Sequence, residues 1–241
     1  MLAVVLLGSI GLNGFLLLTA RRFYDREQQV RLRPSGAPIS HTQGTGPIRV
    51  LFLGDSRIAA WPPLPETRYT TFNGGVSGET TAQILLRAEA AFETAKPQVV
   101  VIQAGINDLK VIGLEPENEK AIAEGCVEHL LELIGIAERH GTRIVFVPVL
   151  PVADLPLARR WVWSPRIEAS RMEVNRRVAQ VLRTKRDAQI LEAESLLDVR
   201  VAGDYRDALH LKPEAYPRLQ EALIPPIDRV AGILNSNPDV K

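Results

Sequence analysis

The sequence predicts an α/β fold with three layers, α/β/α, built on a parallel sheet of about five strands. Segments typical of strands alternate along the chain with segments typical of helices. Residues 98–104 (QVVVIQA) form a nearly continuous apolar run, as expected of a central parallel strand covered on both faces. Glycines follow two of the predicted strands, at Gly54 and Gly105, where they permit a sharp exit from the sheet.

Length and charge limit the possible architectures and partners. A chain of 241 residues suits one globular domain of about 200 residues with a short appendage. We expect an N-terminal segment (1–20), a linker (21–46) and the main domain (47–241). The 29 basic and 28 acidic residues are interspersed and give a net charge of +1, so nothing in the charge favours a nucleic-acid partner. The single cysteine, Cys126, rules out an intrachain disulfide, and we expect its thiol to be buried and inert.

Residues 1–20 (MLAVVLLGSIGLNGFLLLTA) contain no charged side chain. At about 1.5 Å per residue they are long enough to cross a hydrocarbon core of roughly 30 Å. A cleaved secretory signal would show a basic amino-terminal region and a small-x-small cleavage site, and neither is evident. We therefore expect a single membrane anchor, with a cleaved signal as the alternative. Five arginines between residues 21 and 33 favour a cytoplasmic domain by the positive-inside rule, but the side of the membrane is left open.

Elements follow from the spacing of apolar residues, once a linker rich in Pro, Ser, Gly and Thr has passed. His41 lies in this linker and is given no chemical role. The predicted strands are residues 48–53, 70–73, 98–104, 143–149 and 189–193. The predicted helices are one whose apolar face runs from Ile84 to Phe92, then 117–140, 164–185, and a last helix that starts at Pro213.

Four short polar blocks follow these strands or precede these helices. They are Gly54-Asp55-Ser56, Ser77-Gly78-Glu79-Thr80, Gly105-Ile106-Asn107-Asp108 and Asp207-Ala208-Leu209-His210. A serine beyond the end of a strand becomes a nucleophile only if a base takes its proton and fixed donors hold the oxyanion. A histidine can accept and return that proton, and a carboxylate three residues earlier can reach its Nδ1 and fix the tautomer. On this spacing we rank Asp207 above Asp204.

In this order, the four blocks resemble the SGNH hydrolase family, also called the GDSL-like esterases and lipases. The resemblance runs from about Arg49 to the end of the chain and implies the flavodoxin-like SGNH hydrolase fold, with residues 47–241 as the catalytic domain. The family's first block often continues with leucine, whereas Arg57 follows Ser56 here. This departure puts the substrate class in question more than the chemistry.

The resemblance also implies the roles of particular residues. Ser56, Asp207 and His210 would form the catalytic triad. The oxyanion hole would comprise the backbone N–H groups of Ser56 and Gly78 and the side-chain amide of Asn107. Asp55 would be the family's structural aspartate, which orders the loop by hydrogen bonds to the backbone and is not catalytic. Asp108 would be a structural neighbour of Asn107. No metal and no organic cofactor are expected.

These observations predict a membrane-anchored serine esterase that hydrolyses an acyl ester or thioester, of a lipid or an acylated carbohydrate, through an acyl-enzyme on Ser56. One alternative is an O-acyltransferase acting on a carbohydrate, which product analysis with and without an acceptor would distinguish. A second alternative is a catalytically idle binding domain with the SGNH fold. The intact Ser56, Asn107, Asp207 and His210 speak against that second alternative. The oligomeric state is left open.

The connection over residues 150–165 is too long for a routine turn between a strand and a helix. It carries Trp161 and Trp163, two of the three tryptophans in the chain. We expect these rings either to line the acyl pocket or to pack on the following helix, and the sequence does not decide between the two.

Overall fold

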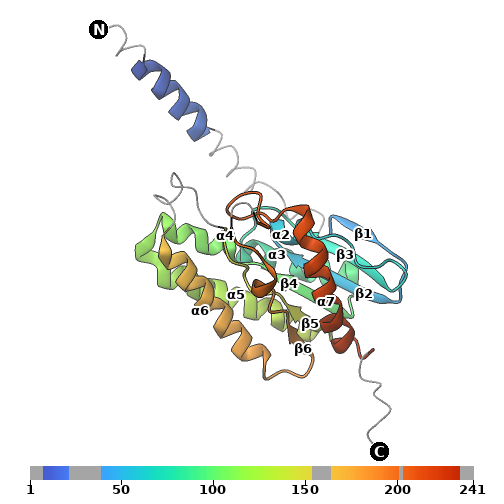
Figure 1. The fold of residues 1–241 in the computed structure, drawn as a ribbon. Coiled ribbons are helices and arrows are strands. Elements are labelled where there is room, and N and C mark those ends of the chain that lie inside the picture. The colour runs from blue at the N-terminus through green and yellow to red at the C-terminus, as the bar shows by residue number, and fades with distance from the viewer. Residues whose placement is uncertain (1–7, 22–38, 154–163, 201–202, 234–241) are drawn as a thin grey trace, which may run out of the picture. The chain divides into compact units, whose positions relative to one another are not determined.

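The protein, described here by a computed structural model, divides into two compact units, Met1–Gly36 and Ala37–Lys241. In the first unit, residues 8–21 are helical. The second unit holds the sheet and the helices α2 to α7 (Figure 1). The residues that the structure describes are 8–21, 39–153, 164–200 and 203–233.

The structure does not support the membrane anchor expected over residues 1–20. Among the described residues, no helix has both the length and the apolar character needed to cross a membrane. Residues 1–7 of the expected anchor lie outside the described residues.

A six-stranded sheet forms the middle layer, with the strand order β1-β3-β2-β4-β5-β6 (Figure 1). The five strands from β2 to β6 pair in parallel, which confirms the predicted parallel sheet. β1 joins the edge by pairing antiparallel with β3, so the complete sheet is mixed. The bounds are β1 His41–Gln43, β2 Ile48–Gly54, β3 Tyr69–Gly75, β4 Val99–Gln103, β5 Arg143–Phe146 and β6 Ala188–Ile190.

His41 lies in the edge strand β1 and not, as was expected from the sequence, in a linker. The three residues of this strand pair with residues 71–73 of β3, and the Ser40 hydroxyl donates a further hydrogen bond to Asn73 O at 2.8 Å. All three residues of β1 are exposed. Alternating apolar residues reveal a strand only when one of its faces is buried, so this edge strand leaves no periodic signal in the sequence.

Helices cover both faces of the sheet and complete the three predicted layers. On one face, α3, α5 and α6 pack against side chains such as Leu51 and Val100. On the other face, α2 and α7 pack against the alternate side chains, such as Val50 and Val99. The bounds are α2 Ser56–Ala59, α3 Thr81–Ala95, α4 Ile106–Leu109, α5 Glu119–Arg139, α6 Pro165–Leu182 and α7 Tyr216–Val230, with short 3-10 turns η1 Lys110–Gly113, η2 Pro116–Asn118, η4 Glu194–Leu196 and η5 Pro213–Ala215.

The centre of the sheet agrees with the sequence analysis. β4 lies between β2 and β5, and all five of its residues are buried. Cys126 of α5 is also buried, as expected, and burial raises the pKa of its thiol. The last helix follows Pro213 as predicted, although its first turn is the 3-10 turn η5.

Parallel pairing brings the carboxyl ends of three strands to one level. Gly54 of β2 is in register with Gly75 of β3 and with Gln103 of β4. A Cβ on Gly75 would lie 2.1 Å from the backbone nitrogen of Ala59, so α2 rests directly on the end of β3 and glycine is required there. The turns that follow these three strands therefore emerge at the same edge of the sheet.

Candidate active site

Ser56 begins α2, immediately beyond the carboxyl end of β2. Asp55 is the N-cap of this short helix, and its Oδ1 accepts a hydrogen bond from the backbone N–H of Arg57 at 3.0 Å. Asp55 is completely buried, and burial raises the pKa of its carboxyl group, although the neighbouring Arg57 acts in the opposite direction. The cap fixes the turn and leaves Ser56 half-buried at the edge of the sheet.

Asp207 and His210 contact each other within one tight turn. Nδ1 of His210 lies 2.8 Å from Oδ2 and 3.0 Å from Oδ1 of Asp207. Oδ1 also accepts hydrogen bonds from the backbone N–H groups of Leu209 and His210, both at 2.9 Å. Partial burial raises the pKa of Asp207, but these hydrogen bonds outweigh it and the pKa falls to about 2. Because a charged carboxylate only accepts hydrogen bonds, Nδ1 carries the ring hydrogen.

Asp204, the spare carboxylate of the sequence analysis, is engaged elsewhere. Its Oδ2 accepts a hydrogen bond from the backbone N–H of Asp198 at 2.6 Å and pairs with Arg218 at 2.6 Å. Of the two candidates, it is thus Asp207 that contacts the histidine.

Asn107 lies in α4 with both ends of its buried amide held. Nδ2 donates to the carbonyl of Glu79 at 2.9 Å, and Oδ1 accepts from Nζ of Lys110 at 2.7 Å. An ammonium only donates and a carbonyl only accepts, so these two contacts identify which end of the amide is the NH₂ group. Glu79 uses one of the two hydrogens on Nδ2, which leaves the second for another acceptor.

Gly78 lies in the turn between β3 and α3, in the left-handed region with φ of +86°. A Cβ at this position would meet no atom of the described residues within 4 Å, so the backbone conformation alone accounts for the glycine. The next residue, Glu79, pairs through its carboxylate with the buried Arg87 at 2.7 Å. Glu79 also receives the hydrogen bond from Asn107, so the turn is fixed to both α3 and α4.

Asp108 has the structural role that the sequence analysis expects. Its carboxylate accepts hydrogen bonds from the backbone N–H of Thr81 at 2.9 Å and from the Thr81 hydroxyl at 2.6 Å. That hydroxyl also lies 3.1 Å from Nδ1 of the half-buried His129. Asp108 thereby ties the start of α3 to α4, next to Asn107.

A cavity of about 280 Å³ opens at this edge, and both Ser56 and His210 line it. Ser77 lines it as well, whereas Gly78 and Asn107 are not among the lining residues of the described chain. A larger depression of about 400 Å³ lies at the amino ends of β5 and β6 and contains none of the predicted site residues. The residues around the smaller cavity are Ser56, Ala59, Ala60, Ser77, Arg206, His210, Leu211, Pro213 and Tyr216.

The predictions for the tryptophans and for metal ligands concern residues beyond the proposed triad. Trp161 and Trp163 lie outside the described residues, so their part in an acyl pocket stays a prediction. Within the described residues, no group of three or more His, Cys, Asp or Glu side chains is placed to hold a metal ion.

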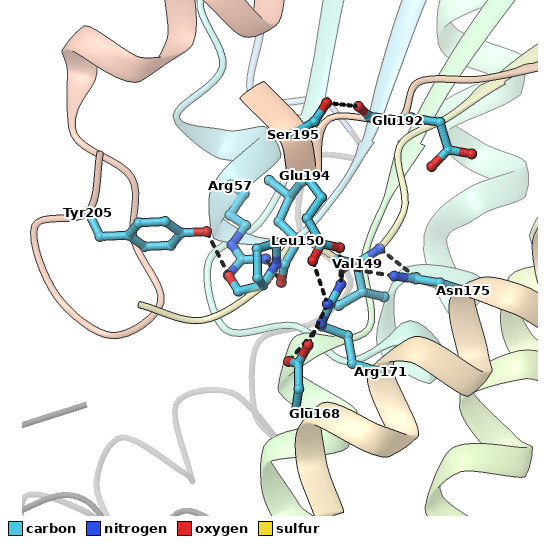
Figure 2. Close-up of polar contacts among 11 residues, drawn as sticks. Arg57, Val149, Leu150, Glu168, Arg171, Asn175, Glu192, Glu194, Ser195 and Tyr205 are labelled. Carbon is cyan, nitrogen blue, oxygen red and sulfur yellow. Dashed lines mark hydrogen bonds and ion pairs between the residues drawn. The ribbon is translucent and has the colours of Figure 1, made fainter. Parts of the chain in front are cut away.

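Nothing in the sequence pattern predicted that Arg57, Arg206 and Tyr216 belong to this site. Arg206 and Tyr216 line the cavity, and the Tyr216 hydroxyl donates to the carbonyl of Arg57 at 3.1 Å. Burial raises the pKa of Tyr216 to about 12. Arg57 is only 1% exposed, and its guanidinium reaches the segment that leaves β5 (Figure 2). The one available signal was the departure from leucine after Gly-Asp-Ser, which gives no indication of burial.

The family to which the chain belongs follows from a comparison with known protein families. Residues 40–218 match the family described as GDSL-like lipase/acylhydrolase. This span is most of the chain and includes all four polar blocks. The chain belongs to the GDSL-like lipase/acylhydrolase family. It is therefore an SGNH-type carboxylic ester hydrolase.

Solved structures similar to this GDSL-like hydrolase share its fold at low sequence identity. A protein of Streptococcus pneumonia provisionally described as a platelet activating factor is 18% identical, with a TM-score of 0.65, over 88% of this chain and 97% of that one. A GDSL-like lipase from Bacteroides thetaiotaomicron is 18% identical, with a TM-score of 0.59, over 75% and 88%. An acetylxylan esterase from Geobacillus stearothermophilus is 16% identical, with a TM-score of 0.60, over 76% and 95%. None of the curated proteins matches the chain in sequence.

The Asp207 turn predicts how the stability of the hydrolase depends on pH. The pKa of Asp207 falls from its usual 3.8 to about 2 on folding, so its charged form stabilises the native state above pH 3.8. That contribution is lost as the pH falls through about 2. We therefore expect Asp207→Asn to unfold at lower urea concentration than the wild type near neutral pH, with the difference shrinking as the pH falls from 4 to 2.

Urea titrations at a series of pH values measure this difference. Asp187→Asn is the control, because the Asp187 side chain is 82% exposed and lies 3.9 Å from Arg143. It should leave the pH dependence unchanged. A stability difference for Asp207→Asn that is the same at every pH would contradict the assignment.

Proposed function

We propose that this hydrolase cleaves acyl esters through an acyl-enzyme on Ser56, with His210 as the general base and acid and Asp207 as its orienting carboxylate. The observation that carries the proposal is that Ser56 and His210 line one cavity while Asp207 contacts Nδ1 of His210 at 2.8 Å. With Nδ1 donating to the carboxylate, Nε2 is the nitrogen left to exchange a proton with the serine.

The reaction has two halves. In the first, Nε2 of His210 takes the proton of the Ser56 hydroxyl as Oγ forms a bond to the carbonyl carbon of the ester. The tetrahedral intermediate then collapses, and the alcohol leaves with the proton returned by His210. In the second half, a water molecule gives a proton to His210 as its oxygen attacks the carbonyl carbon of the acyl-enzyme. The bond to Oγ then breaks, His210 returns the proton to Oγ, and the carboxylic acid leaves with Ser56 restored.

An oxyanion hole is proposed from the backbone N–H groups of Ser56 and Gly78 and from Nδ2 of Asn107. The support for Asn107 is the second hydrogen on Nδ2, whose orientation Lys110 and Glu79 fix. A donor fixed before the reaction stabilises the developing charge without the cost of reorientation. The turn of Gly78 is likewise fixed, through Glu79 and Arg87.

The size of the cavity supports a short acyl chain as the preferred substrate. Its volume, about 280 Å³, is slightly below the usual range of ligand pockets, roughly 300–1,000 Å³. Ala59, Ala60 and Ser77 contribute only small side chains to its lining. One structure of similar fold is described as an acetylxylan esterase, and we propose for this protein a short-chain ester such as an acetylated carbohydrate.

A panel of esters tests this preference. With p-nitrophenyl acetate, butyrate, octanoate and palmitate, kcat/KM should be highest for acetate or butyrate. It should fall by roughly tenfold or more for octanoate, because a chain of that length extends beyond a cavity of about 280 Å³. A kcat/KM that rises steadily with chain length would contradict a short-chain preference.

Substitutions of the triad test the mechanism. Ser56→Ala and His210→Ala should each lower kcat by about 10³-fold or more, and the double variant should be little worse than either, because the two residues act as a unit. Ser77→Ala is the matched control, since this serine lines the same cavity without a place in the triad. It should keep its activity and its labelling by a fluorophosphonate probe, and Ser56→Ala should lose both. Strictly additive losses, or an active Ser56→Ala, would count against the proposal.

Replacement of Asn107 tests the oxyanion hole. Asn107→Ala should reduce kcat by about 10²- to 10³-fold with KM changed far less, because the amide is proposed to act on the transition state. The exposed Asn118 provides the control, and Asn118→Ala should have no effect on either constant. A raised KM with an unchanged kcat would instead make Asn107 a residue that binds the ground state of the substrate.

A further inference from the structure

Arg57 is a buried cation directly next to the proposed nucleophile. Its side chain is 1% exposed and is among the largest that the fold buries completely. The guanidinium donates to three backbone carbonyls: Nη1 to Leu150 at 2.9 Å, Nη2 to Pro151 at 3.1 Å and Nε to Leu209 at 3.0 Å. Among the described residues, no carboxylate forms an ion pair with it. Its hydrogen bonds therefore fix the position of the backbone in these segments. Figure 2 shows the side chain reaching the segment that follows β5.

The three carbonyls belong to two different segments. Leu150 and Pro151 lie in the segment leaving β5, whereas Leu209 immediately precedes His210. The same segments also contact each other, because the backbone N–H of Ala153 donates to Ala208 O at 3.0 Å and the Tyr205 hydroxyl donates to Pro151 O at 2.7 Å. One side chain thus connects the turn of Ser56 to the turn of His210, with the segment after β5 between them.

The bond to Leu209 acts on the peptide that orients the histidine. The N–H groups of Leu209 and His210 both donate to Oδ1 of Asp207, and the carbonyl of Leu209 accepts from Arg57. The peptide between Leu209 and His210 is therefore held on both sides, by a carboxylate and by a guanidinium. A rotation of this peptide would move the imidazole away from the cavity.

We propose that Arg57 is a positioning residue that sets the turn of His210 against Ser56 for proton transfer. This role rests on the proposed serine mechanism. It gives the residue after Gly-Asp-Ser a part in the chemistry, and it explains why a long, charged side chain is buried at this position.

Arg171 of α6 offers a matched control. It is equally buried, at 1% exposure, and its Nη1 donates to Val149 O at 2.8 Å, one residue before the partners of Arg57 (Figure 2). Its other contacts are with the carboxylates of Glu168 and Glu194. Arg171 therefore supports the same segment after β5, but among the described residues it forms no hydrogen bond or ion pair with the turn of Ser56 or with that of His210.

The experiment compares Arg57→Met, Arg57→Lys, Arg171→Met and Ser56→Ala with the wild-type chain. For each protein, kcat and KM on p-nitrophenyl acetate, the rate of fluorophosphonate labelling and the thermal unfolding curve are measured. Arg57→Met should lower kcat by about 10²-fold in the folded protein with KM little changed, because a small displacement of reacting groups has this effect. Labelling should slow in parallel. Arg57→Lys should recover part of both losses, and Arg171→Met should keep kcat once its folded fraction is taken into account.

Two outcomes would overturn the positioning role. One is an Arg57→Met that keeps kcat, and the other is a loss in Arg57→Met and Arg171→Met that follows only their folded fractions. If Arg57→Met does not fold, Arg57→Lys carries the test: a reduced kcat with an unchanged KM supports the proposal, and wild-type kcat overturns it. An active Ser56→Ala would instead overturn the serine mechanism, so the two failures are distinguishable.

Discussion

The parallel register of β2 with β3 and β4 is the constraint on which the site depends. With Gly54 opposite both Gly75 and Gln103, three strands end at one level and their turns emerge together. Ser56, the turn of Gly78 and the α4 segment with Asn107 all come from these turns. A slip of one residue in β2 would exchange its two buried faces and move Ser56 away from the cavity. Burial on both faces of the sheet thus stabilises the fold and also fixes the place of the chemistry.

Beyond the sheet, buried arginines bind the turns and segments that follow the strands, where strand pairing has ended. Arg87 binds Glu79 in the turn of Gly78, Arg171 binds Val149 after β5, and Arg57 binds carbonyls of two segments. Burying a charge costs several kcal/mol. A hydrogen bond to a charged group contributes roughly 1.5–3 kcal/mol, so the three bonds of Arg57 are of the size needed to offset that cost. What the fold gains from Arg57 is therefore a fixed geometry between segments rather than a large net stability.

The two halves of the proposed triad are assembled in different ways. Asp207 and His210 meet within a single turn, where the backbone N–H groups of that turn also bind the carboxylate. Their contact depends on few other parts of the chain. Ser56 and His210 lie far apart in the sequence and share a cavity because the turn after β2 and the start of the last helix meet at one edge of the sheet. The segment after β5 is joined to both by the hydrogen bonds of Arg57. The placement of Ser56 against His210 therefore depends on how distant segments pack. The contact between Asp207 and His210 depends much less on that packing.

Local patterns of residues were enough to predict much of the fold and part of the site. A nearly continuous apolar run predicted the central strand, and shorter segments with apolar residues predicted the other four parallel strands. Helical spacing predicted the long helices, and the close spacing of Asp207 and His210 predicted their contact. The sequence did not reveal the edge strand β1, whose exposed side chains carry no alternation, or the burial of Arg57 and its carbonyl partners.

The edge strand, the burial of Arg57 and the hydrogen bonds of Asn107 with Glu79 and Lys110 are visible only in the folded structure. A charged or polar residue looks the same in the sequence whether water or a distant carbonyl satisfies its hydrogen bonds. Only the folded chain determines which of the two is present, because the partners come from segments that meet after the sheet has formed.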